Sequence, residues 1–188
     1  MDALLTTFLA ALLAEFGDKT QLFAMALAAR YGRPAPIVLG IAVAAIAHCI
    51  LAATGGVLLN DLITFWATSL LVALALVFSG VSGLIDQKRP DMGSNWKVGA
   101  FVTTATGFFL LEMGDKTQFL TVALAAQFDS FGLAAAGAAA GIFAANVPGV
   151  FLAERLGVVL PLRWIRIGAA LIFLFAGFLV AINALRLI

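Results

Sequence analysis

Charged residues are scarce in this 188-residue chain, at 11% of the total, and they nearly balance to a formal net charge of +1. Soluble domains carry about 25% charged residues, and the mean hydropathy here is +1.11, so a water-soluble globule is excluded. No basic run is present that could follow a phosphate backbone, and we therefore expect no nucleic-acid partner. The single cysteine, Cys49, excludes an intrachain disulfide and a multi-cysteine metal site.

Apolar residues make up 63% of the chain and gather into long continuous stretches. A membrane-spanning helix needs about 20 apolar residues, and six stretches satisfy this requirement. They are rich in Ala and Leu and do not alternate as the strands of a barrel would. We therefore predict an all-α integral membrane protein, a single domain 1–188 in the lipid bilayer. Its six transmembrane helices are expected at 3–29, 35–57, 62–85, 98–126, 131–153 and 163–186.

An internal repeat relates the two halves of the chain. Residues 15–29 read EFGDKTQLFAMALAA and residues 112–126, which lie 97 positions later, read EMGDKTQFLTVALAA, so that ten of fifteen positions are identical. Because each half holds three predicted helices, the second copy must enter the membrane from the opposite side. This predicts an inverted-topology repeat, an arrangement typical of secondary transporters. The expected three-helix halves are 1–85 and 98–188, joined by a cytoplasmic linker, 86–97.

The eleven basic residues are distributed unevenly between the two sides of the membrane. Eight fall beside connections on one side, Arg186 falls on the other, and Lys19 and Lys116 lie inside predicted helices. Cytoplasmic loops are enriched in Lys and Arg, so we expect both termini to lie outside the cytoplasm. The eight cytoplasmic residues would be Arg30, Arg33, Lys88, Arg89, Lys97, Arg155, Arg163 and Arg166.

Six charged side chains of the repeated motif fall near the middle of two predicted helices. At about 100° per residue, the three in each copy would share one helical face. A charge at mid-membrane costs about 2.5 to 3.5 kcal/mol, so six unpaired charges would exceed a typical folding stability of about 5 to 15 kcal/mol. They must be paired, protonated or bound to ions. They are Glu15, Asp18, Lys19, Glu112, Asp115 and Lys116.

The four carboxylates and two ammonium groups sum to a formal charge of −2, which one divalent cation or two protons would neutralise. Competition for one site is sufficient for antiport, because crowded carboxylates in a low dielectric take up protons when the metal leaves. Carboxylate and amide oxygens are hard ligands that suit Ca²⁺, Mn²⁺ or Mg²⁺. The candidate metal ligands are Glu15, Asp18, Glu112 and Asp115, with Gln21 and Gln118 on the flank of the same face.

The lysines and threonines of the motif each have two interpretations. Lys19 and Lys116 act as internal counter-ions of the site, or they form simple i to i+4 pairs with the glutamates of their own helices. Thr20 and Thr117 contribute a hydroxyl to the site, or they bond back to their own helices. We expect all four to support the site, because an ammonium repels a cation and is not a metal ligand.

Three further residues, two of them glycines inside the motif, are also open to two interpretations. Gly17 and Gly114 loosen the helices so that backbone carbonyls turn toward an ion, or they allow close helix packing. His48 carries protons or binds the metal, or it is a buried histidine satisfied by one hydrogen bond. Asn146 lies opposite Cys49 in the repeat and is expected to support the site.

The doubled motif resembles the paired E-x-G-D-(K/R)-(T/S) signatures of a family of divalent-cation/proton exchangers. That family includes eukaryotic Golgi calcium and manganese transporters and bacterial manganese exporters of the MneA type. Both copies, EFGDKTQ and EMGDKTQ, match the signature without departure. The resemblance covers essentially the whole chain and implies a six-helix inverted repeat. It also implies that Glu15, Asp18, Glu112 and Asp115 bind the cation, and it favours Mn²⁺ export.

We therefore predict a secondary transporter that exports Mn²⁺, or Ca²⁺, from the cytoplasm in exchange for protons and carries no resident cofactor. Two alternatives remain open: a divalent-cation channel that uses the acids as a selectivity ring, and an exporter that holds a basic amino acid between them. An enzyme is not expected, because no nucleophile and base stand beside the acids and no catalytic zinc motif is present.

Overall fold

The computed structural model describes residues 1–85, 98–152 and 161–186, and their regular secondary structure is entirely α-helical. The prediction of an all-α protein is therefore confirmed. The predicted linker 86–97 and Arg155 lie outside the described residues. The helices are α1 (Asp2–Glu15), α2 (Lys19–Tyr31), α3 (Pro34–Asn60), α4 (Phe65–Leu84), α5 (Ala100–Glu112), α6 (Lys116–Phe128), α7 (Phe131–Phe151) and α9 (Leu162–Ala184).

Four of the described helices, α3, α4, α7 and α9, are long and apolar enough to cross a membrane, and α5 is a shorter apolar helix. The four long helices agree with four of the six predicted spans. Their starts follow local sequence: Pro34 opens α3, where its missing N–H has no helical partner to lose. The hydroxyl of Thr64 caps α4 by accepting the N–H of Ala67 at 3.4 Å. The chain is thus an integral membrane protein with several apolar helices.

The other two predicted helices, 3–29 and 98–126, are each broken in the middle, so the prediction of continuous helices there is wrong. The first is divided into α1 and α2, and the second into α5 and α6. Both breaks fall inside the repeated motif, at residues 16–18 and 113–115. The acids and lysines of each copy therefore do not share one helical face, because they lie on opposite sides of a break.

A glycine in the left-handed region makes each break possible. The φ angle is 72° at Gly17 and 77° at Gly114, values that cost a glycine nothing and strain other residues. The next residue, Asp18 or Asp115, is extended and serves as the N-cap of the following helix. The glycines therefore interrupt the helices; that backbone carbonyls turn toward an ion there stays a prediction.

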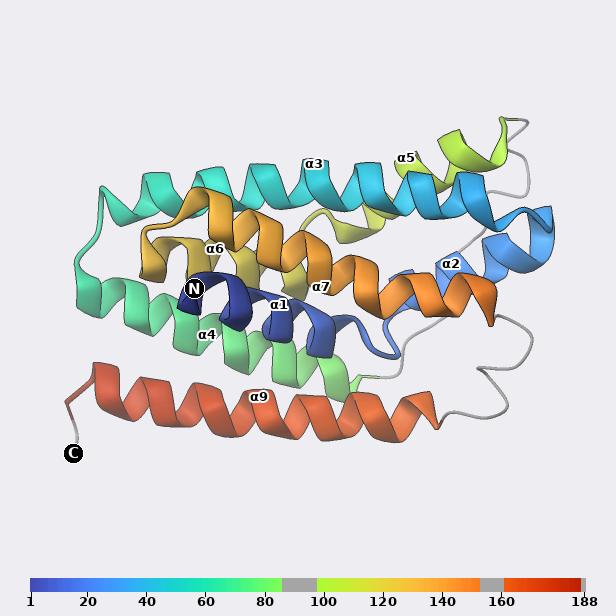
Figure 1. Cartoon of the computed structure of the whole chain (residues 1–188). Helices are drawn as coiled ribbons and strands as arrows, with labels where there is room; N and C mark the ends of the chain where they lie inside the picture. The colour runs from blue at the N-terminus through green and yellow to red at the C-terminus, as the bar shows by residue number, and fades with distance from the viewer. Residues whose placement is uncertain (86–97, 153–160, 187–188) are drawn as a thin grey trace.

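The helices form an elongated bundle in which corresponding helices of the two halves run in opposite directions (Figure 1). α3 and α7 are antiparallel in this sense, and so are α4 and α9. The two termini lie toward the same end of the bundle. The closest packing is between halves: α1 lies against α7, α3 against α5, and α4 against α9.

Matching glycines make these contacts between the halves. A Cβ added to Gly40 in α3 would lie 3.0 Å from the carbonyl oxygen of Phe101 in α5. A Cβ on Gly137, which lies 97 positions later in α7, would overlap the carbonyl oxygen of Leu4 in α1. Small residues at helix crossings allow this close backbone approach in membrane proteins. The two halves thus pack across each other through equivalent contacts.

Candidate metal centre

Three carboxylates converge where the two broken regions meet. Glu15, Glu112 and Asp115 each offer one oxygen, and these oxygens lie within 4.8 Å of one another. Both glutamates are fully buried. Three oxygen ligands at this spacing suit a single hard divalent cation. Asp18, the fourth predicted acid, is not part of this group.

The helix breaks also bring the ends of helices, with their backbone dipoles, to the candidate metal centre. Glu15 is the last residue of α1 and Glu112 is the last residue of α5. The C-terminal end of a helix carries a partial negative charge on its unpaired carbonyl groups. Broken helices of this kind bind cations in other transporters. Glu15 and Glu112 thus lie at negative helix ends, while Asp18 and Asp115 cap the positive ends of α2 and α6.

Each lysine of the motif pairs with the aspartate of the other copy. Lys116 Nζ bonds Asp18 Oδ1, and Lys19 Nζ lies 2.8 Å from Asp115 Oδ1. Lys116 Nζ also lies 3.6 Å from Asp115 Oδ2. The lysines are therefore internal counter-ions that join the two halves. The alternative of i to i+4 pairs with the glutamates is wrong, because the breaks separate those residues.

The two glutamates differ sharply in their hydrogen bonds. Glu15 accepts three: from Thr20 Oγ1 at 2.6 Å, from Thr117 Oγ1 at 2.6 Å and from Asn146 Nδ2 at 3.1 Å. Within the described ranges, neither carboxyl oxygen of Glu112 has a hydrogen-bond partner. The threonine hydroxyls therefore serve the site and not their own helices. Glu112, being buried, needs a cation or a proton to compensate its charge.

The glutamines brace the breaks. Gln21 Oε1 accepts the N–H of Gly17 at 3.0 Å, and Gln118 Oε1 accepts the N–H of Gly114 at 2.7 Å. Gln21 Nε2 also donates to the carbonyl oxygen of Ala145 at 2.7 Å, a backbone contact for which the sequence holds no signal. Both amide oxygens are thus engaged by the backbone in this conformation.

His48 is fully buried in α3, and its ring meets that of Phe109 edge-on at a centroid distance of 6.4 Å. Neither ring nitrogen has a hydrogen-bond partner among the residues that the structure describes. It does not belong to the group of three carboxylates. Its part in transport stays a prediction.

The two breaks are covered to different extents. A Cβ on Gly17 would lie 2.8 Å from the carbonyl oxygen of Leu162 and 3.2 Å from Cβ of Arg166, both in α9. A Cβ on Gly114 would meet no described atom within 4 Å. The start of α9 therefore covers the first break, while the second has open space beside it. The motif alone could not reveal these contacts, because α9 lies outside it.

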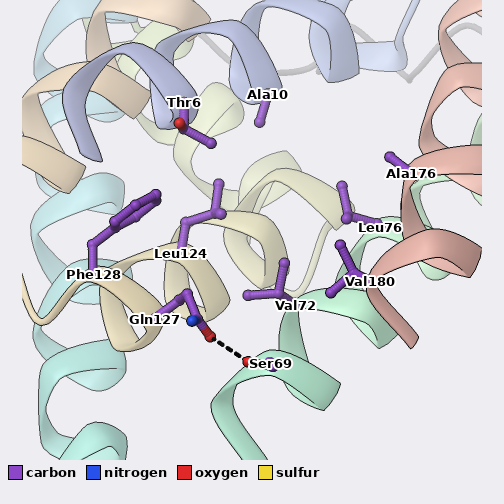
Figure 2. Close-up of a pocket in the computed structure, with 10 residues that line it drawn as sticks. All are labelled: Thr6, Ala10, Ser69, Val72, Leu76, Leu124, Gln127, Phe128, Ala176 and Val180. Atoms are coloured by element: carbon purple, nitrogen blue, oxygen red, sulfur yellow. Dashed lines mark hydrogen bonds between the residues drawn. The ribbon is translucent and has the colours of Figure 1, made fainter. Parts of the chain in front are cut away.

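A cavity of about 370 Å³ lies between α1, α4, α6 and α9, apart from the carboxylates. Figure 2 shows that apolar side chains such as Val72, Leu76 and Leu124 point into it. At one edge Ser69 Oγ donates to Gln127 Oε1 at 3.2 Å. None of the residues 15–21 and 112–118, which hold the EFGDKTQ and EMGDKTQ motifs, lines this cavity. Its apolar lining cannot replace the water shell of a cation, so the carboxylates are the better candidate for the ion site.

Comparison with known proteins agrees with this geometry. The chain matches the family described as "Divalent cation/proton antiporter GDT1" over residues 3–91 and 100–187, one segment in each half. The chain belongs to this family. It is 37% identical over 177 residues to a Vibrio cholerae serotype O1 protein named "Putative manganese exporter", covering 93% of this chain and 88% of that relative. No solved structure matches the chain.

Membership in this family confirms the resemblance seen in the repeated motif. It makes the chain a divalent cation/proton antiporter, with divalent cations and protons as its transported substrates. The protein is therefore a transporter and not an enzyme. The alternatives of a channel and of an amino-acid exporter are set aside on the same ground.

Proposed function

We propose that this antiporter exports Mn²⁺ from the cytoplasm and that Glu15, Glu112 and Asp115 bind the metal. The observation that carries the proposal is the convergence of these three carboxylates within 4.8 Å. Oxygen ligands suit Mn²⁺ and Ca²⁺ alike. The 37% identity to a protein named as a manganese exporter supports Mn²⁺ as the main substrate.

Charge balance explains the coupling to protons. The four acids of the motif and its two lysines carry a formal charge of −2, and in this metal-free arrangement each lysine pairs with the aspartate of the other copy. One Mn²⁺ or two protons would neutralise this charge in a medium where an uncompensated charge is costly. Either substrate therefore excludes the other, and exchange needs no separate proton path.

In the membrane, each broken pair of helices acts as one span, with its break near the midplane. α1 with α2 and α5 with α6 then join the four long helices to give six spans in two inverted three-helix halves, 1–85 and 98–188. The opposite directions of corresponding helices (Figure 1) and the matched glycine contacts support this arrangement. Inverted repeats of this kind carry their substrate at the repeat interface.

Alternating access follows if the two copies of the motif exchange environments. Here the first break is covered by α9, at Leu162 and Arg166. The residues 97 positions earlier are Phe65 and Ser69, which belong to α4. In the opposite state α4 would cover Gly114 as α9 now covers Gly17.

The glutamine contacts would exchange in the same way. Gln21 Nε2 now donates to the carbonyl oxygen of Ala145, whereas Gln118 Nε2 lies 3.8 Å from the sulfur of Met113. The counterpart of Ala145 in the first half is His48. In the opposite state we expect Gln118 to donate to the carbonyl oxygen of His48.

The orientation proposed for the protein places both termini outside the cytoplasm of a bacterial cell, in the inner membrane. The end of α2, the start of α3 and the start of α9 lie at one end of the bundle, opposite the termini (Figure 1). These segments carry Arg30, Arg33, Arg163 and Arg166. A concentration of Arg at one end is typical of the cytoplasmic side.

Transport by purified protein in liposomes tests this proposal. Vesicles with an acidic interior and Mn²⁺ outside should accumulate Mn²⁺ against its gradient, since each unit of ΔpH supplies about 1.4 kcal/mol per proton. A protonophore should abolish the accumulation. Ca²⁺ in place of Mn²⁺ should move more slowly. Downhill Mn²⁺ leakage that ignores the pH gradient would show that the proposed exchange is wrong.

A further inference from the structure

The identical lysines of the two motif copies hold very different positions, and one of them lies on a proposed metal ligand. We propose that Lys19 is a mobile counter-cation that sets the metal affinity: its ammonium occupies Asp115 in the metal-free site and moves away when the metal binds. This inference rests on the proposed function, in which Asp115 is one of three carboxylates that bind Mn²⁺.

The ammonium of Lys19 lies directly beside a proposed metal ligand. Lys19 Nζ lies 2.8 Å from Asp115 Oδ1, and Asp115 offers an oxygen to the group that also contains Glu15 and Glu112. A divalent cation bound to the same carboxylate would lie within a few ångströms of this ammonium. Repulsion between two cations at such a distance is strong in a low dielectric, so the two compete for Asp115.

The side chain of Lys19 is freer to move than that of Lys116. The Lys19 side chain is 27% exposed, and it is a flexible four-carbon stem that can move its charge away. Lys116 is 2% exposed and is held by Asp18 and Asp115 together. The same residue type is therefore mobile in the first copy and fixed in the second, and only Lys19 can leave as the metal enters.

This difference gives the two lysines separate tasks. Lys116 permanently compensates the buried Asp18. Lys19 weakens metal binding by returning to Asp115, which helps the metal to leave toward the second side of the membrane. A transport site must bind its ion well enough to load it and weakly enough to release it. Without the Lys19 ammonium, the metal should bind more tightly and leave more slowly.

Substitution of the two lysines in parallel tests the inference. Mn²⁺ binding to purified protein and Mn²⁺ transport in liposomes would be measured for wild type, Lys19→Met and Lys116→Met. For Lys19→Met we expect the Kd to fall about tenfold, the scale of groups that surround metal ligands, with both KM and the maximal transport rate lowered. Lys116→Met should instead lower the stability of the metal-free protein more than Lys19→Met does, because the buried Asp18 loses its partner.

Lys19→Arg provides a second variant that shifts affinity the other way. A guanidinium binds a carboxylate through two parallel hydrogen bonds and leaves it less readily than an ammonium. We expect the Kd for Mn²⁺ to rise about threefold, with the protein folded as in wild type. A Kd for Lys19→Met that is unchanged or raised, or a Kd for Lys19→Arg that is not raised, would overturn the inference. Wild-type protein that neither binds nor transports Mn²⁺ would refute the proposed function instead.

Discussion

The two copies of the motif share their Glu, Gly, Asp, Lys, Thr and Gln residues but lie in unequal surroundings. Glu15 accepts three hydrogen bonds, and Glu112 accepts none from the described parts of the chain. One reason is visible in the repeat: Asn146 donates to Glu15, and its counterpart near the other copy is Cys49, a much weaker donor. The two copies have the same motif residues, so the difference between them comes from the residues that surround each copy.

The aspartates should show the largest difference between the copies. Asp18→Asn leaves the ammonium of Lys116 buried without its main partner, and losing one partner of a buried pair costs about 3 to 5 kcal/mol. Asp115→Asn should cost much less, because the partly exposed Lys19 can turn toward solvent. Unfolding of the metal-free proteins in detergent would measure both.

A double substitution provides the control for the buried pair. Asp18→Asn combined with Lys116→Gln removes both charges, and we expect it to recover most of the lost stability. Equal losses for Asp18→Asn and Asp115→Asn would show that burial does not distinguish the two ion pairs.

Substitution of either glutamate by glutamine should abolish most transport, but the two variants should differ in their unfolding temperatures. Glu112→Gln and Glu15→Gln should each lower Mn²⁺ transport by about 100-fold or more, since a lost ligand costs at least as much as a lost surrounding group. Without metal, Glu112→Gln should raise the unfolding temperature, because it removes a buried carboxyl that has no donor. Glu15→Gln should lower it, because its amide N–H₂ would replace an oxygen that accepts either from Thr117 or from both Thr20 and Asn146. Transport in liposomes and thermal unfolding measure the two effects. A lower unfolding temperature for Glu112→Gln, or a higher one for Glu15→Gln, would show that the hydrogen bonds do not distinguish the two glutamates.

The glycines of the two breaks should show the smallest difference. An alanine at either position is strained by a positive φ, at a cost of about 1 to 2 kcal/mol. Gly17→Ala adds a Cβ that would lie 2.8 Å from the carbonyl oxygen of Leu162, whereas Gly114→Ala adds one into open space. We expect Gly17→Ala to cost about 1 to 3 kcal/mol more. Equal unfolding temperatures would mean that α9 does not cover the first break in solution.

The long helices and the acids could be predicted from the sequence because both follow from local composition. Continuous apolar runs identify α3, α4, α7 and α9, and the cost of charge in lipid singles out Glu15 and Glu112 as candidate site residues. The breaks were missed because an isolated glycine is tolerated inside an apolar helix. A signal was nevertheless present: Asp directly after Gly is a favoured N-cap, which predicts a new helix at Lys19 and Lys116.

The partners of the charges could not be predicted. The sequence required that the charges be paired, protonated or bound to ions, but it left open whether Lys19 pairs with Glu15 in its own helix or acts as a counter-ion elsewhere in the site. The choice depends on the break and on how the halves pack, which are tertiary properties. The same limit applies to Leu162, because nothing in α9 marks the residue that covers Gly17.

The most direct measurement is calorimetric titration of Mn²⁺ into the purified protein at several pH values, in two buffers of different ionisation enthalpy. If metal and protons compete for one carboxylate site, affinity must fall as pH falls, and up to two protons must be released per Mn²⁺ bound. Glu112→Gln should abolish both effects. Mn²⁺ binding of equal affinity at every pH, without proton release, would contradict the competition on which the exchange depends.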